Sequence, residues 1–319
     1  MKKSILLSAA ALLMGMMLPA AEPEQFVPAN SFVVTRLNAQ MLMDLPLVKS
    51  NIDKAKQSAG SDLKKLQALG IEPEDFIAGE VWGASELESS AFFLLIKTRI
   101  KENQFKTMLT ELTGKNPGAE FNTLEIDGQK VYTVKFANQE KFENKTSAAA
   151  YLADDVILLS ENTPNLAQVI RAAKAGGKNP LKEKLNRQVL LAVLGDASVL
   201  GNDRFSMVDM QLDLIGANKN ILTLAGEVTC KDVNLAQQSA MQMQFILQGI
   251  VGMIFGKDPQ LSQALLQNMQ IVPADKNLKF KYQLDVAVLE KVVKYLEDHA
   301  KKTSFPPTAV PAEAQVNKQ

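Results

Sequence analysis

The sequence predicts an α+β fold of two structurally similar lobes, each an antiparallel sheet with helices packed on one face. Strand-length apolar runs recur in both halves of the 319-residue chain and are alternating or β-branched, as in half-buried strands. Each half also sends a central strand directly into a helix: 91–98 precedes 102–113, and 221–230 precedes 233–255. Each half opens with an isolated strand and closes with a helix, so we interpret the chain as a structural duplication.

The first 21 residues are typical of an export signal. Lys2 and Lys3 precede an apolar run that ends at Pro19 and Ala20, which is the order of charged, apolar and small-residue regions in a leader. The run is short for a membrane span, so we favour cleavage over an uncleaved anchor. We therefore expect an exported protein, periplasmic or extracellular, with no membrane span in the mature chain.

The remaining chain is expected to divide into two lobes and a tail. About 300 residues are more than one core usually spans, and Asn179-Pro180 marks a break between the halves. We place the first lobe at 22–178 and the second at 179–302. Residues 303–319 are rich in Pro and Ala and are expected to be disordered.

Cap and turn residues define the expected elements of the first lobe. Asn38 is typical of a helix cap, Gly70 of a helix end, and Asp127-Gly128 of a two-residue hairpin turn. The predicted elements are a strand at 31–37, a helical stretch from 38 to 69 broken near Pro46, strands at 77–83 and 91–98, a helix at 102–113, hairpins at 121–136 and 148–160, and a helix from the cap Thr163 to Gly176-Gly177.

The second lobe is predicted from alternation and caps in the same way. Apolar and polar side chains alternate from 205 to 215, as in a half-buried strand. We expect Leu224 to point inward, and Val293 and Leu296 to lie on the buried side of the last helix. The expected elements are strands at 189–194, 205–215 and 221–230, the helix at 233–255, a shorter helix from Pro259 to about Met269, a strand at 278–284 and a closing helix from Asp285 to Ala300.

The helix at 233–255 stands out because no charged residue occurs between Asp232 and Lys257. Asp232 is a suitable cap, and Gly256 suits the left-handed position just after the helix. One stripe of apolar residues recurs at alternating spacings of four and three and is expected to face the sheet. This stripe consists of Ala236, Ala240, Met243, Leu247, Ile250 and Ile254.

The opposite side of this helix holds Met241, Phe245 and Gly252, again without a charge. A helix packed only on a sheet usually carries charged residues there. Its glutamines argue against membrane insertion. We therefore expect a second layer over this back face, formed by the helix after Pro259, by a protein partner or by self-association.

The residues that carry most enzyme chemistry are scarce. His299 is the only histidine and Cys230 the only cysteine, which disfavours Ser-His-Asp, Cys-His and zinc sites. We expect a solvated His299, and a buried, inert Cys230 at the end of its strand. We assign no catalytic, metal-binding or cofactor-binding residue and no cofactor. Equal numbers of basic and acidic residues, 35 of each, disfavour nucleic acid as a partner.

Carboxylates need no histidine and require separate consideration. Asp154-Asp155 fits a hairpin turn. Asp209 and Asp213 share one strand face, but about 13 Å separates them at strand rise, too far for a shared proton. A Ser-Lys pair would leave no local signature, so it stays open.

One resemblance rests on the segment GIEPEDF, from Gly70 to Phe76, which follows a helix. Together with the export signal, the opening strand, the strand–helix–hairpin order and a second similar half, it resembles exported bacterial proteins of unknown function. The resemblance implies the same fold outline and supplies no catalytic residues.

We therefore expect an exported, non-enzymatic binding or scaffold protein of the bacterial cell envelope. Two alternatives stay open. One is a carrier that encloses an apolar ligand, lipid or peptide, for which we expect a large apolar cavity under the long helix. The other is an envelope hydrolase that uses carboxylates or a Ser-Lys pair, for which we expect carboxylates clustered in a cleft.

Overall fold

The computed structural model describes residues 21–58, 60–86, 92–114, 119–136, 146–160, 166–200, 203–215 and 220–303. Nearly all of the predicted leader, nearly all of the predicted tail and the predicted cap Thr163 lie outside these residues.

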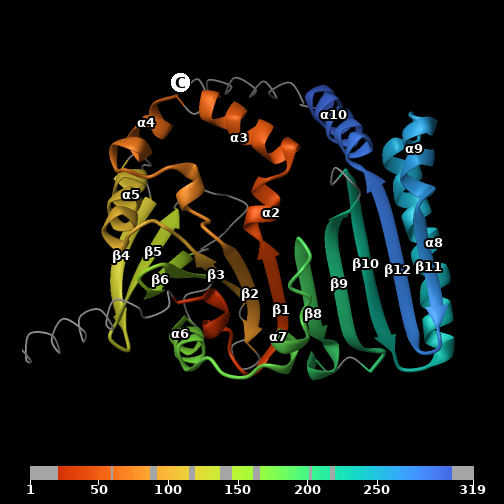
Figure 1. Cartoon of the computed structure of the whole chain (residues 1–319), viewed down its shortest axis with the longest axis horizontal. Helices are drawn as coiled ribbons and strands as arrows, with labels where there is room; N and C mark the ends of the chain where they lie inside the picture. Colours follow the sequence, from red (N-terminus) through yellow and green to blue (C-terminus); the bar gives the residue numbers. More distant parts are fainter. Residues whose placement is uncertain are drawn as a thin grey trace, which may run out of the picture.

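The strands of the described chain form one open antiparallel sheet, in the order β11-β12-β10-β9-β8-β1-β2-β3-β7-β6-β5-β4 (Figure 1). This confirms the predicted α+β class with an antiparallel sheet. The strands are β1 (Ser31–Asn38), β2 (Glu80–Glu86), β3 (Phe92–Lys97), β4 (Ala119–Ile126), β5 (Gln129–Phe136), β6 (Thr146–Ala153), β7 (Val156–Ser160), β8 (Leu191–Asp196), β9 (Phe205–Ile215), β10 (Ile221–Cys230), β11 (Met269–Ala274) and β12 (Asn277–Asp285).

The two halves of the chain meet at a seam formed by β1 and β8, which pair antiparallel with Val34 opposite Leu194. Strands of the first half lie on one side of this pair and strands of the second half on the other. Both halves thus share a single sheet.

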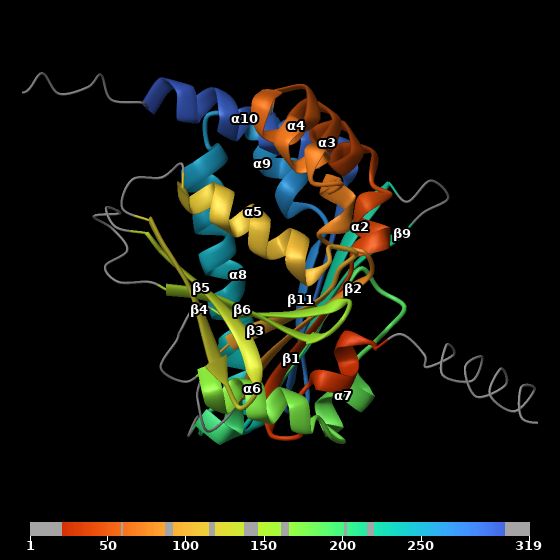
Figure 2. The same ribbon diagram turned by 90° about the vertical axis from the view of Figure 1, so that its left-hand side faces the viewer.

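Helices cover the sheet unevenly. They are η1 (Pro23–Phe26), α2 (Ala39–Met43), α3 (Pro46–Ser58), α4 (Gly60–Ala68), η2 (Pro73–Asp75), α5 (Glu102–Gly114), α6 (Leu166–Ala175), α7 (Pro180–Lys184), η3 (Ala197–Leu200), α8 (Val233–Phe255), α9 (Pro259–Leu266) and α10 (Val286–Thr303). In Figure 2, α5 and α8 lie on one side of the sheet and α7 on the other. In Figure 1, no helix lies in front of β9, β10 and β12.

The largest core cluster joins the first half to the seam. Val27, just after η1, and Trp82 on β2 are both fully buried within it, together with the inner side of α6 and Leu181 of α7. A second cluster lies under α5, where Phe105 meets Tyr132 and Tyr151 edge-on. Apolar burial on this scale is the main stabilising term of the fold.

Several local predictions are confirmed by backbone geometry. Asn38 caps α2, since its Oδ1 accepts a hydrogen bond from the backbone N–H of Met41 at 3.1 Å. The turn between β4 and β5 has positive φ at Asp127 (51°) and Gly128 (73°), as a type I′ turn requires. Gly70, which ends the helical stretch, has a φ of 69°.

The prediction near Met269 was wrong. The helix expected to reach this residue ends at Leu266, and 269–274 form the edge strand β11 instead. Pro273 argues against a central strand, but an edge strand tolerates proline because its outer N–H needs no partner. Asp275, with a φ of 52°, turns the chain into β12. This turn was hard to predict because the position with positive φ is not a glycine.

Three predicted burial assignments were also wrong. Leu224 on β10 is 36% exposed, and Val293 and Leu296 on α10 are 37% and 46% exposed. The inner side of α10 is formed by Val288, Leu289, Val292 and Tyr295, which pack against α9 and β12. The helix is rotated toward α9, and that rotation leaves Val293 and Leu296 on its flank.

A candidate interaction surface on helix α8

The helix α8 has the predicted bounds, but Gly256 does not adopt the predicted left-handed conformation, since its φ is −60°. Asp232 Oδ1 accepts a hydrogen bond from the backbone N–H of Leu235 at 2.8 Å, which caps the first turn. The N-terminal half packs Ala236 and Ala240, both almost fully buried, on β10, β11 and β12. Small residues here let the helix lie close to the sheet.

A hydrogen bond fixes the rotation of α8 about its axis. Gln244 Nε2 donates to the backbone carbonyl of Ile271 on β11 at 3.1 Å. Near its C-terminus the helix turns a different side inward, where Val251 and Phe255 pack with Leu261 and Leu265 of α9. Phe255 also contacts Tyr295, with ring centroids 5.2 Å apart.

This change of inward side corrects the predicted stripe. Met243 and Leu247 pack against the core as expected. Ile250 and Ile254 do not, since each is 44% exposed. The stripe fails over the last two turns because α9 and α10 pack against the adjacent side of the helix, where Val251 and Phe255 lie.

The remaining surface of α8 is free of charge and mixes exposed apolar side chains with exposed glutamines, such as Gln237, Gln242 and Gln248. Beyond Val233, six large apolar side chains are exposed: Met241 63%, Phe245 79%, Ile246 56%, Ile250 44%, Met253 82% and Ile254 44%. At about 200 Å² per fully exposed side chain of this size, they expose on the order of 700 Å². The largest apolar patch on a typical monomer is about 300–600 Å². We call these six residues the α8 face.

The expected cover over this face is absent from the described chain. The helix α9, one of the predicted covers, reaches only the end of α8 around Phe255. Met241 and Phe245 therefore remain open to solvent. No helix in the described part of the chain is long and apolar enough to cross a membrane.

Two glycines interrupt the same side of α8. A Cβ added at Gly249 or at Gly252 would meet nothing within 4 Å among the described residues. Packing within the chain therefore does not require glycine at either position. Glycine in a helix interior costs about 1 kcal/mol relative to alanine, and no close contact within the described residues accounts for that cost.

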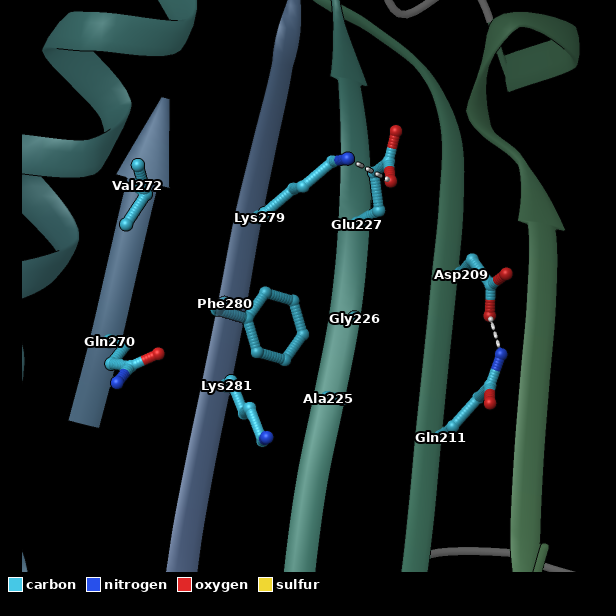
Figure 3. Close-up of a pocket in the computed structure, with 10 residues that line it drawn as sticks. All are labelled: Asp209, Gln211, Ala225, Gly226, Glu227, Gln270, Val272, Lys279, Phe280 and Lys281. Carbon is cyan, nitrogen blue, oxygen red and sulfur yellow. Dashed lines mark hydrogen bonds and ion pairs between the residues drawn. The ribbon is translucent and has the colours of Figure 1, made fainter. Parts of the chain in front are cut away.

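A second surface lies on the opposite face of the sheet, over β9 to β12 (Figure 3). It is a shallow cavity of about 370 Å³ whose floor includes Ala225 and Gly226. Its charged and polar groups are partly paired: Lys279 Nζ lies 3.6 Å from Glu227, and Gln211 donates to Asp209 at 3.3 Å. Phe280 is pressed against Gly226, where an added Cβ would come within 2.3 Å of the ring.

The residues considered for chemistry lie apart from one another. Cys230 is buried, as predicted, and burial raises the pKa of its thiol. His299 belongs to α10, but its side chain lies outside the described residues. No group of three or more His, Cys, Asp or Glu within the described ranges is arranged to hold a metal ion.

A buried charge at the seam was missed by sequence reasoning. Arg36 on β1 is 3% exposed and donates to Glu80 and to the carbonyl of Val189. Glu80 also accepts from Trp82 Nε1 at 2.8 Å. Burial alone would raise the pKa of Glu80, but the hydrogen bonds from Arg36 and Trp82 outweigh it, so this pKa is lowered. The available sequence signal for this buried charge was the arginine within the β-branched strand sequence SFVVTRL.

The fold and this surface define a single-sheet α+β protein with an exposed apolar helix. No protein-family model matches the chain, and no curated protein matches it. Solved structures of TP0453, a Treponema protein of unclear function, are similar at low identity. Crystal form I is 11% identical over 87% of this chain and 98% of that one, with a TM-score of 0.46. Crystal form III is 11% identical over 86% and 98%, with a TM-score of 0.47.

Proposed function

We propose that this chain is an exported, non-enzymatic binding or scaffold protein of the bacterial cell envelope, and that the α8 face is its protein-binding surface. The observation that carries the proposal is the exposure of six large apolar side chains on a helix without charge. Exposed apolar area of this size marks interaction sites on soluble proteins.

Export rests on the leader pattern at the start of the sequence, where Lys2 and Lys3 precede the apolar run. The periplasm or the extracellular space is the location that follows. The balanced charge of the chain disfavours nucleic acid as a partner, so the partner that we propose is a protein.

We also infer that the two halves are versions of one unit. Counting outward from the seam, β1, β2 and β3 follow one another on one side, and β8, β9 and β10 on the other. The next strand on each side, β7 or β12, precedes a helix in the sequence. This shared order supports the lobe division at 178/179.

The carrier remains the second candidate. Its support is the sheet face below α5 and α8, where Leu224 is 36% and Phe92 51% exposed. The cavity of Figure 3 lies on the other face and has charged residues in its lining. It therefore does not supply the apolar enclosure that a carrier needs.

The hydrolase ranks below both. Asp209 and Glu227 line the same cavity. Asp209 accepts a hydrogen bond from the neutral Gln211, and Glu227 forms an ion pair with Lys279. Each carboxylate is thus engaged by a neighbouring side chain, and this cavity supports a hydrolase less than the α8 face supports a binding role.

Site-specific photo-crosslinking tests the binding proposal. A benzophenone side chain at position 245, in cells that make the full chain, should yield a protein adduct, and Met241→Lys in the same chain should abolish it. The same probe at Gln237, which is exposed on α8 outside the α8 face, serves as the control. Absence of an adduct from both 245 and 253 would contradict the proposal.

A further inference from the structure

We propose that the partner of the α8 face is a second copy of this chain, with the two α8 helices packed antiparallel across a twofold axis. This inference rests on the proposed binding function and names its occupant.

The exposed area fits a homodimer. The α8 face exposes on the order of 700 Å² per chain, and a standard interface buries about 800 Å² per partner. Homodimer interfaces are also more apolar than transient ones and have few charges at their core. The α8 face meets that description, because α8 carries no charged residue along its 23 positions.

The absence of charge favours a like-with-like contact. A twofold axis places the same surface on both subunits, so any charge at its centre would meet its own copy. Between Asp232 and Lys257 there is none. An antiparallel arrangement also sets the dipoles of the two helices in opposite directions, which is electrostatically favourable.

The order of large and small residues selects the register. At 100° per residue, Met241 and Phe245 share the outward side of α8 with Gly252 and Gly256. An antiparallel pair whose axis passes between Gln248 and Gly249 sets Phe245 over Gly252 of the other copy and Met241 over Gly256. Phe245 and Met241 then each meet a glycine.

A parallel pair would instead place Phe245 on Phe245 and glycine on glycine. That arrangement leaves a gap at Gly252 and crowds the phenyl rings. The antiparallel register also explains why Gly249 and Gly252 are glycines, although the chain itself leaves space for a Cβ there. Small residues let two helix backbones approach closely, so that a large side chain of one helix fills the space beside a glycine of the other.

Disulfide cross-linking of purified full chains tests both the partner and the register. All variants carry Cys230→Ala, which removes the native buried thiol. A mixture of Phe245→Cys and Gly252→Cys chains, oxidised with a copper catalyst, should give the mixed dimer. Gly249→Cys should cross-link with itself.

Phe245→Cys alone should stay monomeric on a denaturing gel. In the proposed register its two copies lie about 10 Å apart along the axis, beyond the reach of a disulfide. Self-cross-linking at 245 together with none between 245 and 252 would overturn the register. Thermal melts of each variant before oxidation show that the chains tested are folded.

Two further outcomes separate this inference from the proposed function. A chain that stays monomeric at high concentration but forms adducts with a different protein at 245 overturns the homodimer and leaves the binding function standing. A monomer that instead co-sediments with phosphatidylglycerol–phosphatidylcholine vesicles, and loses this with Phe245→Lys, overturns both.

Discussion

Gln244 on α8 donates a hydrogen bond through Nε2 to the backbone carbonyl of Ile271 on β11, at 3.1 Å. This contact occupies an edge-strand carbonyl that would otherwise be open to another strand. It also fixes which side of α8 meets the sheet. The neighbouring Phe245 consequently points to solvent and is 79% exposed.

Replacing Gln244 with alanine should lower the free energy of unfolding by about 1 kcal/mol, the usual value of one net hydrogen bond. The measurement is urea denaturation below the concentration of any dimer. Gln248→Ala, an exposed glutamine of the same helix, is the matched control and should change stability by less than about 0.5 kcal/mol. Equal effects of the two would mean that the Ile271 contact contributes nothing.

Gly252→Ala should act in opposite directions on stability and association. It should stabilise the monomer by about 0.5–1 kcal/mol, because alanine is the better helix former and the site has space for a Cβ. It should also weaken the dimer, because the added methyl group occupies the space that Phe245 of the other copy would fill. Gly114→Ala, in a glycine of α5 with similar space, should leave association unchanged. Thermal melts and sedimentation at several concentrations separate the two effects.

Acid should weaken the seam through Glu80. Its pKa is lowered in the folded chain, so the unfolded chain binds the proton more tightly. The contribution of Glu80 is therefore complete above about pH 4.5, its ordinary value, and is lost as the pH falls through the folded value. Glu80→Gln should make the free energy of unfolding fall less steeply as the pH is lowered. The reduction in slope should correspond to at most one bound proton.

The same variant should lower stability at pH 7 by about 2–3 kcal/mol, because Arg36 is left as a buried charge without its partner. This is less than for a fully buried pair, since the side chain of Glu80 is 35% exposed. Urea melts from pH 3 to 7 give both quantities. Glu125→Gln, on the exposed strand β4, is the control at pH 7. Parallel pH profiles for wild type and Glu80→Gln would contradict this account of the seam.

Asn179 joins the connector between the halves to the N-terminal segment. Its Nδ2 donates to the carbonyls of Pro28, Ala29 and Ser31, each at 3.0 Å, while its Oδ1 caps α7. Asn179→Ala should cost more than about 3 kcal/mol, because several buried groups lose their partner.

Asn38→Ala is the comparison for this prediction, because it removes a single cap bond and should cost about 1 kcal/mol. Chemical denaturation of both variants gives the difference. A cost at Asn179 no larger than that at Asn38 would show that the carbonyl contacts are not stabilising.

Local signals in the sequence predicted the elements whose ends carry caps or turns. The start of α8 follows from Asp232, and the β4–β5 hairpin from Asp127-Gly128. These features depend on residues close in sequence. The edge strand β11 was missed because Pro273 is unfavourable in every strand except an edge, and edge position is set by the rest of the sheet.

Contacts between distant segments account for the remaining differences. The inward side of α8 changes near Phe255 because α9 and α10 pack there. Arg36 is buried only because Glu80 and Val189 come from neighbouring segments. The uncharged back face of α8 was visible in the sequence, whereas its exposure depended on where α9 lies.

Sedimentation equilibrium of the purified chain, with and without Phe245→Lys, tests the central claim most directly. The account predicts a reversible dimer for the wild type, and a dissociation constant raised at least about 30-fold by Phe245→Lys, as for a buried aromatic anchor. Gln237→Lys, which adds the same charge to an exposed position of α8, should leave the constant unchanged. A wild type that remains monomeric at every concentration, or a dimer equally weakened by both lysines, would contradict it.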